Sequence, residues 1–520
     1  MLSITPRTVR EQNGIRPFQE STLKALKSKN RLITVEAPVG SGKSYIIRRI
    51  IEDGTLSERP IILTYPTKIL MNAQINALKK EIGNVRHWPE EPELYGEITL
   101  FEYSTDALIS HLKKHPEVAK LDKSEIINQV LRNHQFSSRH NIVVTTPDVL
   151  HLIRRGVYRG SQRLEALLNG AIVVFDEFHL YTGLKNFAPL IAWLADTIAG
   201  KVVFLSATPT ANEEMEQIWS KYSSTLISFK DSIGGSSDRI FNYPLKLHVE
   251  ECRYTKTDIM LGQLKKYLPV LSKPTAVIFD SVFRLRHLKP LINKAFNDQF
   301  DILEYSGMEK DHLTFKKNTV ILGTASIEVG VEMPIKSLIT EASYWTSAVQ
   351  RLGRVGRDCP GEVVLFTRKR LSPFLKDRSV LTRDDLEQNI LQSALKESIG
   401  TMVSGEMFRG DSYPFLLIDK KNKIPMPYSE ALFAMFDIED DFISNWRKIY
   451  EKEKRDNLKS DYGISDEAIK DILLRDKIFP FCGVVSGRLR TEYDNVTTKL
   501  TDHELMIQLS KTGKTYYFDL

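Results

Sequence analysis

The sequence predicts an α/β fold with two parallel-sheet domains in tandem, followed by a C-terminal α+β accessory domain. Apolar runs rich in β-branched residues alternate with segments of helical pattern, which is typical of parallel sheets. A Gly-Gly-Ser-Ser stretch at residues 234–237 separates two series of such runs and has the composition of a linker. We therefore expect a first domain over residues 1–228, a second over 229–370 and the accessory domain over 371–520.

The composition is that of a globular protein with several domains. The chain has 520 residues, of which 42% are hydrophobic and 27% charged, and this balance excludes a protein that is disordered throughout. A net charge of +6 permits an anionic partner without requiring one. Three cysteines far apart in the sequence exclude a disulfide framework. The chain has neither a signal-like start nor an apolar run of membrane-spanning length, so we expect a cytoplasmic protein without membrane contact.

A strand, a glycine-rich loop and a helix follow one another near the N-terminus. Residues 31–36 read RLITVE, and the apolar helical stretch 45–51 follows the loop. This order predicts a phosphate loop, because backbone N–H groups and a helix N-terminus bind phosphate well. Lys43 would reach the β- and γ-phosphates of ATP, and Ser44 would ligate Mg²⁺, although Ala37 stands where the motif usually has its first glycine. The expected ATP-binding residues of the loop are Gly40, Ser41, Gly42, Lys43 and Ser44.

The peptide RPFQ at residues 16–19 offers a means of reading the base of the nucleotide. A glutamine amide has a donor and an acceptor, as the edge of adenine does. We expect Gln19 to contact adenine, although the peptide taken alone is equally an ordinary turn and helix start.

A second polar loop carries two carboxylates. Residues 170–175 read GAIVVF, which suits a buried parallel strand, and lead into Asp-Glu-Phe-His. Ligands bind at the carboxyl ends of strands in such sheets. We therefore expect Asp176 to hold Mg²⁺ through water and Glu177 to orient and deprotonate the attacking water. His179 would link the nucleotide to the neighbouring domain.

A third apolar run, residues 201–205, leads into Ser-Ala-Thr. Small hydroxyl side chains at this sheet edge can form hydrogen bonds with the carboxylate loop. A change in the conformation of that loop would then reach other parts of the molecule through them. Ser206 and Thr208 are therefore expected to couple the nucleotide site to the rest of the molecule.

The second series of runs ends in QRLGRVGR at residues 350–357. Hydrolysis of ATP builds negative charge on the γ-phosphoryl group, and arginine donates to two of its oxygens at once. We expect Arg354 and Arg357, three positions apart on a helix, to project into the ATP site of the first domain, and we include Gln350 in the catalytic set. The alternative is a solvated basic helix face.

Taken in order, AxxGxGKS, DEFH, SAT and QRLGRVGR resemble the motifs of superfamily 2 helicases of the DExH type over about residues 15–370. The resemblance implies two RecA-like domains, ATP hydrolysis and movement along a nucleic-acid strand. It further implies that Thr67, Thr146 and Thr324 contact the strand. Gly330 would lie at the nucleotide between the two domains.

Within that superfamily, DEFHLY and QRLGRVGR look closest to the CRISPR-associated helicase-nuclease of type I systems. The chain has no His-Asp dipeptide and little sequence before Gln19, so it resembles the form without a nuclease domain, as in subtype I-D. The implied partners are single-stranded DNA and a crRNA-guided surveillance complex with a separate nuclease subunit.

Other interpretations stay open at this point. The same motifs would serve a DExH helicase acting on RNA or in DNA repair, a motor that moves along duplex DNA, or a nucleotide-gated recruitment module that does not translocate. We also expect a helical insertion over residues 96–140, whose basic residues favour a solvated face over a specific DNA contact.

Overall fold

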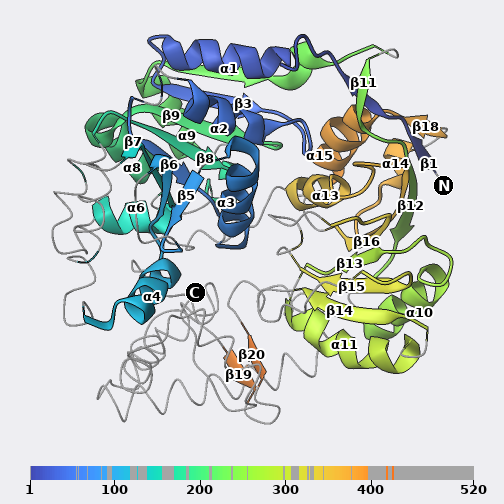
Figure 1. Cartoon of the computed structure of the whole chain (residues 1–520). Coiled ribbons are helices and arrows are strands. Elements are labelled where there is room, and N and C mark those ends of the chain that lie inside the picture. Colours follow the sequence, from blue (N-terminus) through green and yellow to red (C-terminus); the bar gives the residue numbers. More distant parts are fainter. Residues whose placement is uncertain are drawn as a thin grey trace, which may run out of the picture.

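The computed structural model describes most of the chain between residues 2 and 395 (Figure 1). Beyond residue 395 it describes 417–419 and 424–426 alone. The gaps within the first part are residues 54–55, 57, 67, 84, 91–95, 118–125, 127–137, 155–164, 166–168, 183–186, 210–212, 236–237, 255, 281, 297–298, 306–314, 325–326, 328–332, 343–344 and 376–377. In the described part, no helix has the length and apolar character needed to cross a bilayer.

The first sheet is parallel throughout, with the strand order β10-β3-β9-β8-β4-β7-β6-β5. Its strands are β3 (Leu32–Glu36), β4 (Ile61–Thr64), β5 (Val85–Trp88), β6 (Gly96–Glu102), β7 (Ser138–Thr145), β8 (Ala171–Asp176), β9 (Ala199–Ser206) and β10 (Ser224–Ser228). Because all carboxyl ends lie at one edge, the loops that follow β3, β8 and β9 are neighbours there.

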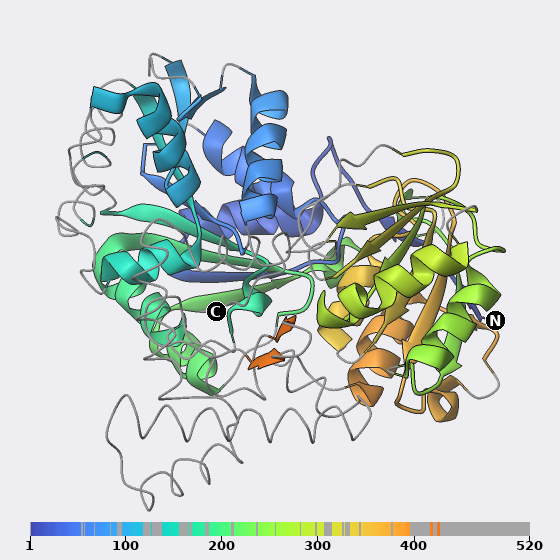
Figure 2. The same ribbon diagram turned by 90° about the horizontal axis from the view of Figure 1, so that it is seen from below.

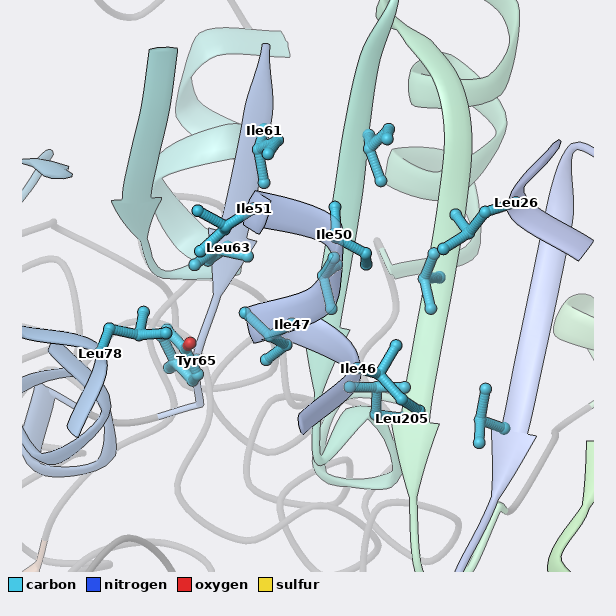
Figure 3. Close-up of a cluster of buried hydrophobic side chains, with 14 of the residues drawn as sticks. Leu26, Ile46, Ile47, Ile50, Ile51, Ile61, Leu63, Tyr65, Leu78 and Leu205 are labelled. Atoms are coloured by element: carbon cyan, nitrogen blue, oxygen red, sulfur yellow. The ribbon is translucent and has the colours of Figure 1, made fainter. Parts of the chain in front are cut away.

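Helices cover both faces of this sheet, since alternate strand residues point to opposite sides. One face packs against α1 (Pro17–Lys27), α2 (Lys43–Glu52) and α3 (Lys68–Ile82). Figure 3 shows the isoleucines of α2 pointing toward Ile61, Leu63 and Leu205 of the strands. The other face packs against α4 (Thr105–Lys114), α6 (Pro147–Arg154), α8 (Phe187–Trp193) and α9 (Glu213–Lys221). Burial on two faces explains the near-continuous apolar runs of the central strands.

The second sheet has the order β14-β15-β13-β16-β17-β12-β1-β18. Its strands are β1 (Leu2–Ile4), β12 (Leu245–Glu251), β13 (Thr275–Ile278), β14 (Asp301–Tyr305), β15 (Thr319–Gly323), β16 (Ser337–Glu341), β17 (Gly361–Thr367) and β18 (Val380–Leu381). Helices α10 (Thr257–Tyr267) and α11 (Val282–Phe296) pack on one face. Helix α13 (Trp345–Leu352) and a π-helix, η5 (Asp385–Leu391), pack on the other. The predicted α/β fold with two parallel-sheet domains is thus confirmed.

The N-terminal strand belongs to the second sheet, which the sequence did not predict. Strand β1 pairs antiparallel with β12 and parallel with β18, so the first residues lie far from the first sheet (Figure 1). The chain then forms β2 (Arg7–Val9), which pairs with β11 (Arg239–Asn242) of the connection between the sheets. Two chain segments, those that contain β2 and β11, therefore join the domains. The boundary expected between the two domains at residue 228 stays a prediction.

One expectation on local structure needs correction. The segment 96–140 is not helical throughout, because residues 96–102 form β6 inside the first sheet and α4 accounts for the helical pattern after it. The residues ITLFE of β6 pair with β5 on one side and with β7 on the other. This pairing with distant segments makes them a strand, although the segment was expected to be helical. In the C-terminal region, residues 385–394 form η5 and the short helix α15 (Gln392–Ala394) on the second sheet. Most of the expected accessory domain lies outside the described residues.

The two sheets lie side by side with the linker strands along one side (Figures 1 and 2). Helix α13 of the second sheet faces the phosphate loop region of the first. A Cβ atom added to Gly353, just after α13, would come within 2.6 Å of the Cβ of Val39. This glycine therefore permits a close approach between the two domains.

Candidate ATP site between the two sheets

The phosphate loop lies between β3 and α2, as predicted. Gly40 and Gly42 have φ values of 80° and 89°, a backbone region that glycine adopts without strain. Lys43 begins α2, and its Nζ donates to the carbonyl oxygens of Ala37 and Pro38 at 2.9 and 3.3 Å. Ser44 is exposed on the first turn of the helix. The loop thus has the backbone shape and the cation that phosphate binding requires.

Helix α1 holds the phosphate loop through two side chains. The amide nitrogen of Gln19 donates to the carbonyl oxygen of Gly42 at 2.9 Å, and the Gln19 carbonyl oxygen accepts from the backbone N–H of Arg16. The Arg16 guanidinium donates to the carbonyl oxygen of Ser41. Each polar end of Gln19 thus makes one hydrogen bond to protein and keeps one further donor or acceptor site, and its contact with adenine stays a prediction.

The two carboxylates follow β8 at its carboxyl end. Burial and the adjacent Glu177 carboxylate raise the pKa of Asp176 to about 7, although Lys43 opposes this shift. Burial would also raise the pKa of Glu177, but the nearby positive charge of Lys43, together with Gln350 and Arg354, holds it below its ordinary value. The Glu177 carboxylate lies 3.9 Å from Nζ of Lys43. Of the two carboxyl groups, Glu177 is therefore the one that ionises more readily.

A chain of hydrogen bonds runs from His179 to the loop after β9. Burial lowers the pKa of His179 to about 4, so its ring is neutral at pH 7. Nδ1 of His179 lies 2.8 Å from Oγ of Ser206, which also accepts from the backbone N–H of Thr208 at 3.0 Å. The Ser206 carbonyl oxygen accepts from the N–H of Ala37 at the start of the phosphate loop. Ser206 and Thr208 thus connect the carboxylate loop to the phosphate loop.

Gln350 reaches into this site from α13 of the second domain. Its Nε2 donates to the carboxylate of Glu177 at 3.1 Å and lies 3.2 Å from Nε2 of His179. Since Nε2 of the neutral ring must accept this hydrogen bond, Nδ1 carries the proton and donates to Ser206. The side chain of Gln350 is 2% exposed. One buried amide therefore links the carboxylate loop of the first domain to the second domain.

Arg354 and Arg357 do not lie on a helix, and this expectation was wrong. Helix α13 ends at Leu352, because Gly353 follows and Gly356 adopts a φ of 74° that interrupts helical bonding. The Arg354 charge still acts on Glu177, and Nε of Arg357 donates to the carbonyl oxygen of Gly353 at 2.9 Å. The charge of Arg354 therefore acts on the carboxylate site from a turn rather than from a helix face, whereas the printed contact of Arg357 is with Gly353 of its own domain.

The residues expected to contact nucleic acid also follow strands. Thr146 follows β7 and is half-buried, and its carbonyl oxygen accepts from Val149 at the start of α6. Thr324 follows β15 and is 8% exposed. Thr67 and Gly330 lie outside the described residues. The two described threonines stand at carboxyl ends of parallel strands, one in each sheet, and their contact with a strand stays a prediction.

The donors present fit a magnesium nucleotide. The hydroxyl of Ser41, the hydroxyl of Thr208 and the amide of Asn242 are buried around the phosphate loop and have no hydrogen-bond partner in the described part of the chain. A buried polar group without a partner is costly, so a ligand with oxygen and nitrogen atoms would satisfy these groups. Ser44 and Asp176 supply oxygen atoms, which Mg²⁺ prefers.

Comparison with known families agrees with this geometry. A model described as DEAD/DEAH box helicase matches residues 16–217, which contain the phosphate loop, both carboxylates and Ser206. Residues 16–217, which we call the helicase domain below, are therefore similar to that family. The predicted resemblance to superfamily 2 helicases is thereby confirmed. The matched range contains every strand of the first sheet except β10, and the arginine loop lies beyond it.

One curated relative and several solved structures are similar to the chain. The CRISPR-associated helicase Cas3 of Thermoproteus tenax is 27% identical over 280 residues, which cover 49% of this chain and 46% of the relative. The chain thus spans about half the length of that relative. The helicase MrfA bound to DNA and AMPPNP shares 17% identity with a TM-score of 0.46, covering 72% of this chain and 54% of its own. Mss116p bound to ssRNA and AMP-PNP shares 15% identity with a TM-score of 0.46, covering 87% and 83%.

Sequence reasoning missed two residues near this site. Arg351 is 3% exposed and donates to the Asp280 carboxylate at 2.6 Å and to the Glu341 carbonyl oxygen at 2.7 Å. It anchors α13, and with it Gln350, to the ends of β13 and β16. The second is Asn242 of the linker, whose amide lies 3.6 Å from a Cβ built on Gly40. No local pattern marks it, since its position depends on the pairing of β2 with β11.

Proposed function

We propose that the protein is an ATP-dependent helicase that moves along single-stranded DNA. The observation that carries this proposal is the contact of Gln350, from the second domain, with Glu177 and His179 of the helicase domain. An ATP site closed by a second domain is suited to converting hydrolysis into relative movement of the two domains. A protein that only binds nucleotide has no need for such an arrangement around a catalytic carboxylate.

In the proposed reaction, the phosphate loop binds the phosphates of ATP and Lys43 neutralises the β- and γ-phosphates. Glu177 accepts a proton from the attacking water, which its ionised state allows. Gln350 orients the Glu177 carboxylate. Ser44 and Asp176 would hold Mg²⁺, which supplies positive charge beside the phosphate oxygens. Arg354 and Arg357 stabilise the charge that develops on the transferred phosphoryl group.

The hydrogen bonds around His179 provide the proposed coupling. When the Glu177 carboxylate changes its partners, Gln350 and His179 lose a shared contact, and Ser206 and Thr208 adjust with them. We infer that this change alters how tightly the two domains bind the nucleic-acid strand. Thr67, Thr146 and Thr324 are the proposed strand contacts, and Gly330 the proposed position between the domains.

We further propose that the strand is target DNA in CRISPR interference, supplied to a separate nuclease by a crRNA-guided complex. The similarity to a CRISPR-associated helicase over half of the chain supports this role. The rival substrates are RNA and damaged DNA, and the rival function is nucleotide-gated recruitment without movement.

Steady-state ATP hydrolysis tests these proposals. The purified protein is measured alone and with single-stranded DNA, single-stranded RNA or duplex DNA, and a Lys43→Ala variant excludes a contaminating ATPase. Stimulation by single-stranded DNA alone supports the proposed motor, and an unwinding assay on a tailed duplex then tests strand separation. Stimulation by RNA alone would replace DNA by RNA as substrate. Hydrolysis that no nucleic acid changes would contradict the translocation proposal.

A further inference from the structure

We propose that Arg383 is a positioning residue for ATP hydrolysis, fixing the backbone that carries Arg354 and Arg357 through a buried ionic network with Glu387 and Arg7. The inference rests on the proposed function, since it concerns the arginine loop of the same site. None of these three residues touches the nucleotide in the proposed reaction, so Arg383 would act through the arginine loop.

The backbone between the two arginines is held by two bonds. Arg383 donates from Nη2 to the carbonyl oxygen of Val355 at 2.9 Å, and the N–H of Tyr243 donates to the carbonyl oxygen of Gly356 at 2.7 Å. The loop also has little free space, because a Cβ on Gly356 would come within 2.9 Å of the Arg383 guanidinium. Successive carbonyl groups between Arg354 and Arg357 are therefore both held from outside the loop. The direction of each arginine side chain depends on these bonds.

The Arg383 guanidinium is itself held by a network of charges. Its Nη1 lies 3.9 Å from the carboxylate of Glu387, which accepts from Arg7 at 2.7 Å. The half-exposed carboxylate of Asp384 also pairs with Arg7. Arg383, Glu387 and Arg7 have side chains that are 1%, 5% and 9% exposed. The positive charges of Arg7 and Arg383 are thus neutralised by the carboxylates of Asp384 and Glu387 near the start of η5.

Such a network is better suited to positioning than to stability. Buried ion pairs lose much of their attraction to desolvation, and apolar replacements of similar volume are often no less stable. Burial, with repulsion from Arg7 and Arg357, lowers the pKa of Arg383 to about 10, so the residue still carries its charge at pH 7. What the network provides is a planar group with fixed orientation on the Val355 carbonyl.

The same network connects the arginine loop to the N-terminal segment. Arg7 lies on β2, which pairs with linker strand β11, and the chain continues through Arg16 into α1. The side chains of Arg16 and of Gln19 on α1 contact the phosphate loop. The N-terminal segment therefore contacts both halves of the proposed ATP site. This arrangement lets one segment set the position of the arginine loop relative to the phosphate loop.

The test compares Arg383→Met with Arg370→Met in the full chain. Arg370 is a matched control, because it is exposed in the segment that follows β17. We expect Arg383→Met to lower kcat for ATP at least tenfold, with KM for ATP and binding of a fluorescent ATP analogue within twofold of the parent protein, at a temperature at which circular dichroism shows both proteins folded. Arg370→Met should match the parent protein in all three. A kcat for Arg383→Met within twofold of the parent would overturn the proposal.

A double-mutant cycle separates positioning from a merely structural role. If Arg383 acts through the arginine loop, Arg383→Met should lower kcat by less than threefold in an Arg357→Ala background, because the arginine it positions is already absent. Equal losses in both backgrounds would contradict the proposal. Should Arg383→Met fail to fold, Glu387→Gln keeps the shape and removes the charge. We then expect a lower kcat with the same non-additivity, and an unchanged kcat would overturn the inference.

The outcomes also distinguish this inference from the proposed function. A parent protein that hydrolyses no ATP under any condition refutes the proposed function itself. A parent protein with stimulated hydrolysis and an Arg383→Met variant that is equally active refutes the positioning role alone.

Discussion

The contact of Gln350 with the helicase domain gives the sharpest prediction. In Gln350→Ala, the Glu177 carboxylate loses a donor at 3.1 Å and Nε2 of His179 loses its partner at 3.2 Å. Gln350 is 2% exposed, so water replaces these bonds poorly. The variant therefore tests whether the second domain contributes to hydrolysis through this one amide.

The size of the effect follows from the kind of bond that is lost. A hydrogen bond to a charged group contributes about 1.5–3 kcal/mol. If the bond is made mainly in the closed state that hydrolyses ATP, its loss lowers kcat by roughly 10- to 150-fold, since each 1.4 kcal/mol is tenfold. Binding of ATP should change by less than threefold, because the phosphate loop and Lys43 remain intact.

The assay is ATP hydrolysis at saturating single-stranded DNA, with binding of a fluorescent ATP analogue measured in parallel. Gln217→Ala is the matched control, because Gln217 is exposed on α9, outside the loops that form the site. A kcat for Gln350→Ala within twofold of the parent protein refutes the reasoning. So does a fall in kcat that is fully explained by weaker nucleotide binding.

Three further variants test other parts of the site. Glu177→Gln should lower kcat at least a hundredfold while nucleotide binding persists, because it removes the base alone, and near-normal hydrolysis would reject that role. Ser206→Ala removes the acceptor shared by His179 and Thr208, so stimulation by DNA should fall more than basal hydrolysis, which rate measurements with and without DNA will show. Arg351→Ala leaves the Asp280 carboxylate without its 2.6 Å partner and should lower the free energy of unfolding by about 3–5 kcal/mol in urea. A loss below 1 kcal/mol would mean that solvent replaces Arg351.

Much of the first domain could be predicted from sequence because its signals are local. A β-branched run followed by glycines and a helix specifies strand, loop and helix within about twenty residues, as in β3 and α2. The parallel arrangement then places the ends of β8 and β9 beside the phosphate loop without further information. Lys43, Asp176, Glu177 and Ser206 were therefore brought together as expected.

The features that sequence reasoning missed depend on contacts between distant segments. The helix expected over Arg354 and Arg357 fails because Gly356 is held in a left-handed conformation by Tyr243 and Arg383, neither of which is nearby in sequence. The orientation of Gln19 toward the Gly42 carbonyl depends on how α1 packs on α2. No periodicity within a short window encodes such contacts.

The two-stranded connection through β2 and β11 has a consequence for how the chain folds during synthesis. Arg7 and its partner Asp384 are 377 positions apart, and β1 also pairs with a strand near the end of the second sheet. At about 5–20 residues per second, the ribosome needs roughly 20–75 s to supply the partners of the first strand. Until β12 emerges, β1 is an unpaired strand with exposed backbone donors and acceptors, and its other edge stays unpaired until β18 emerges. The helicase domain can fold first, and the N-terminal segment docks only when the second sheet has emerged, so the ATP site is completed only after the second sheet has been synthesised.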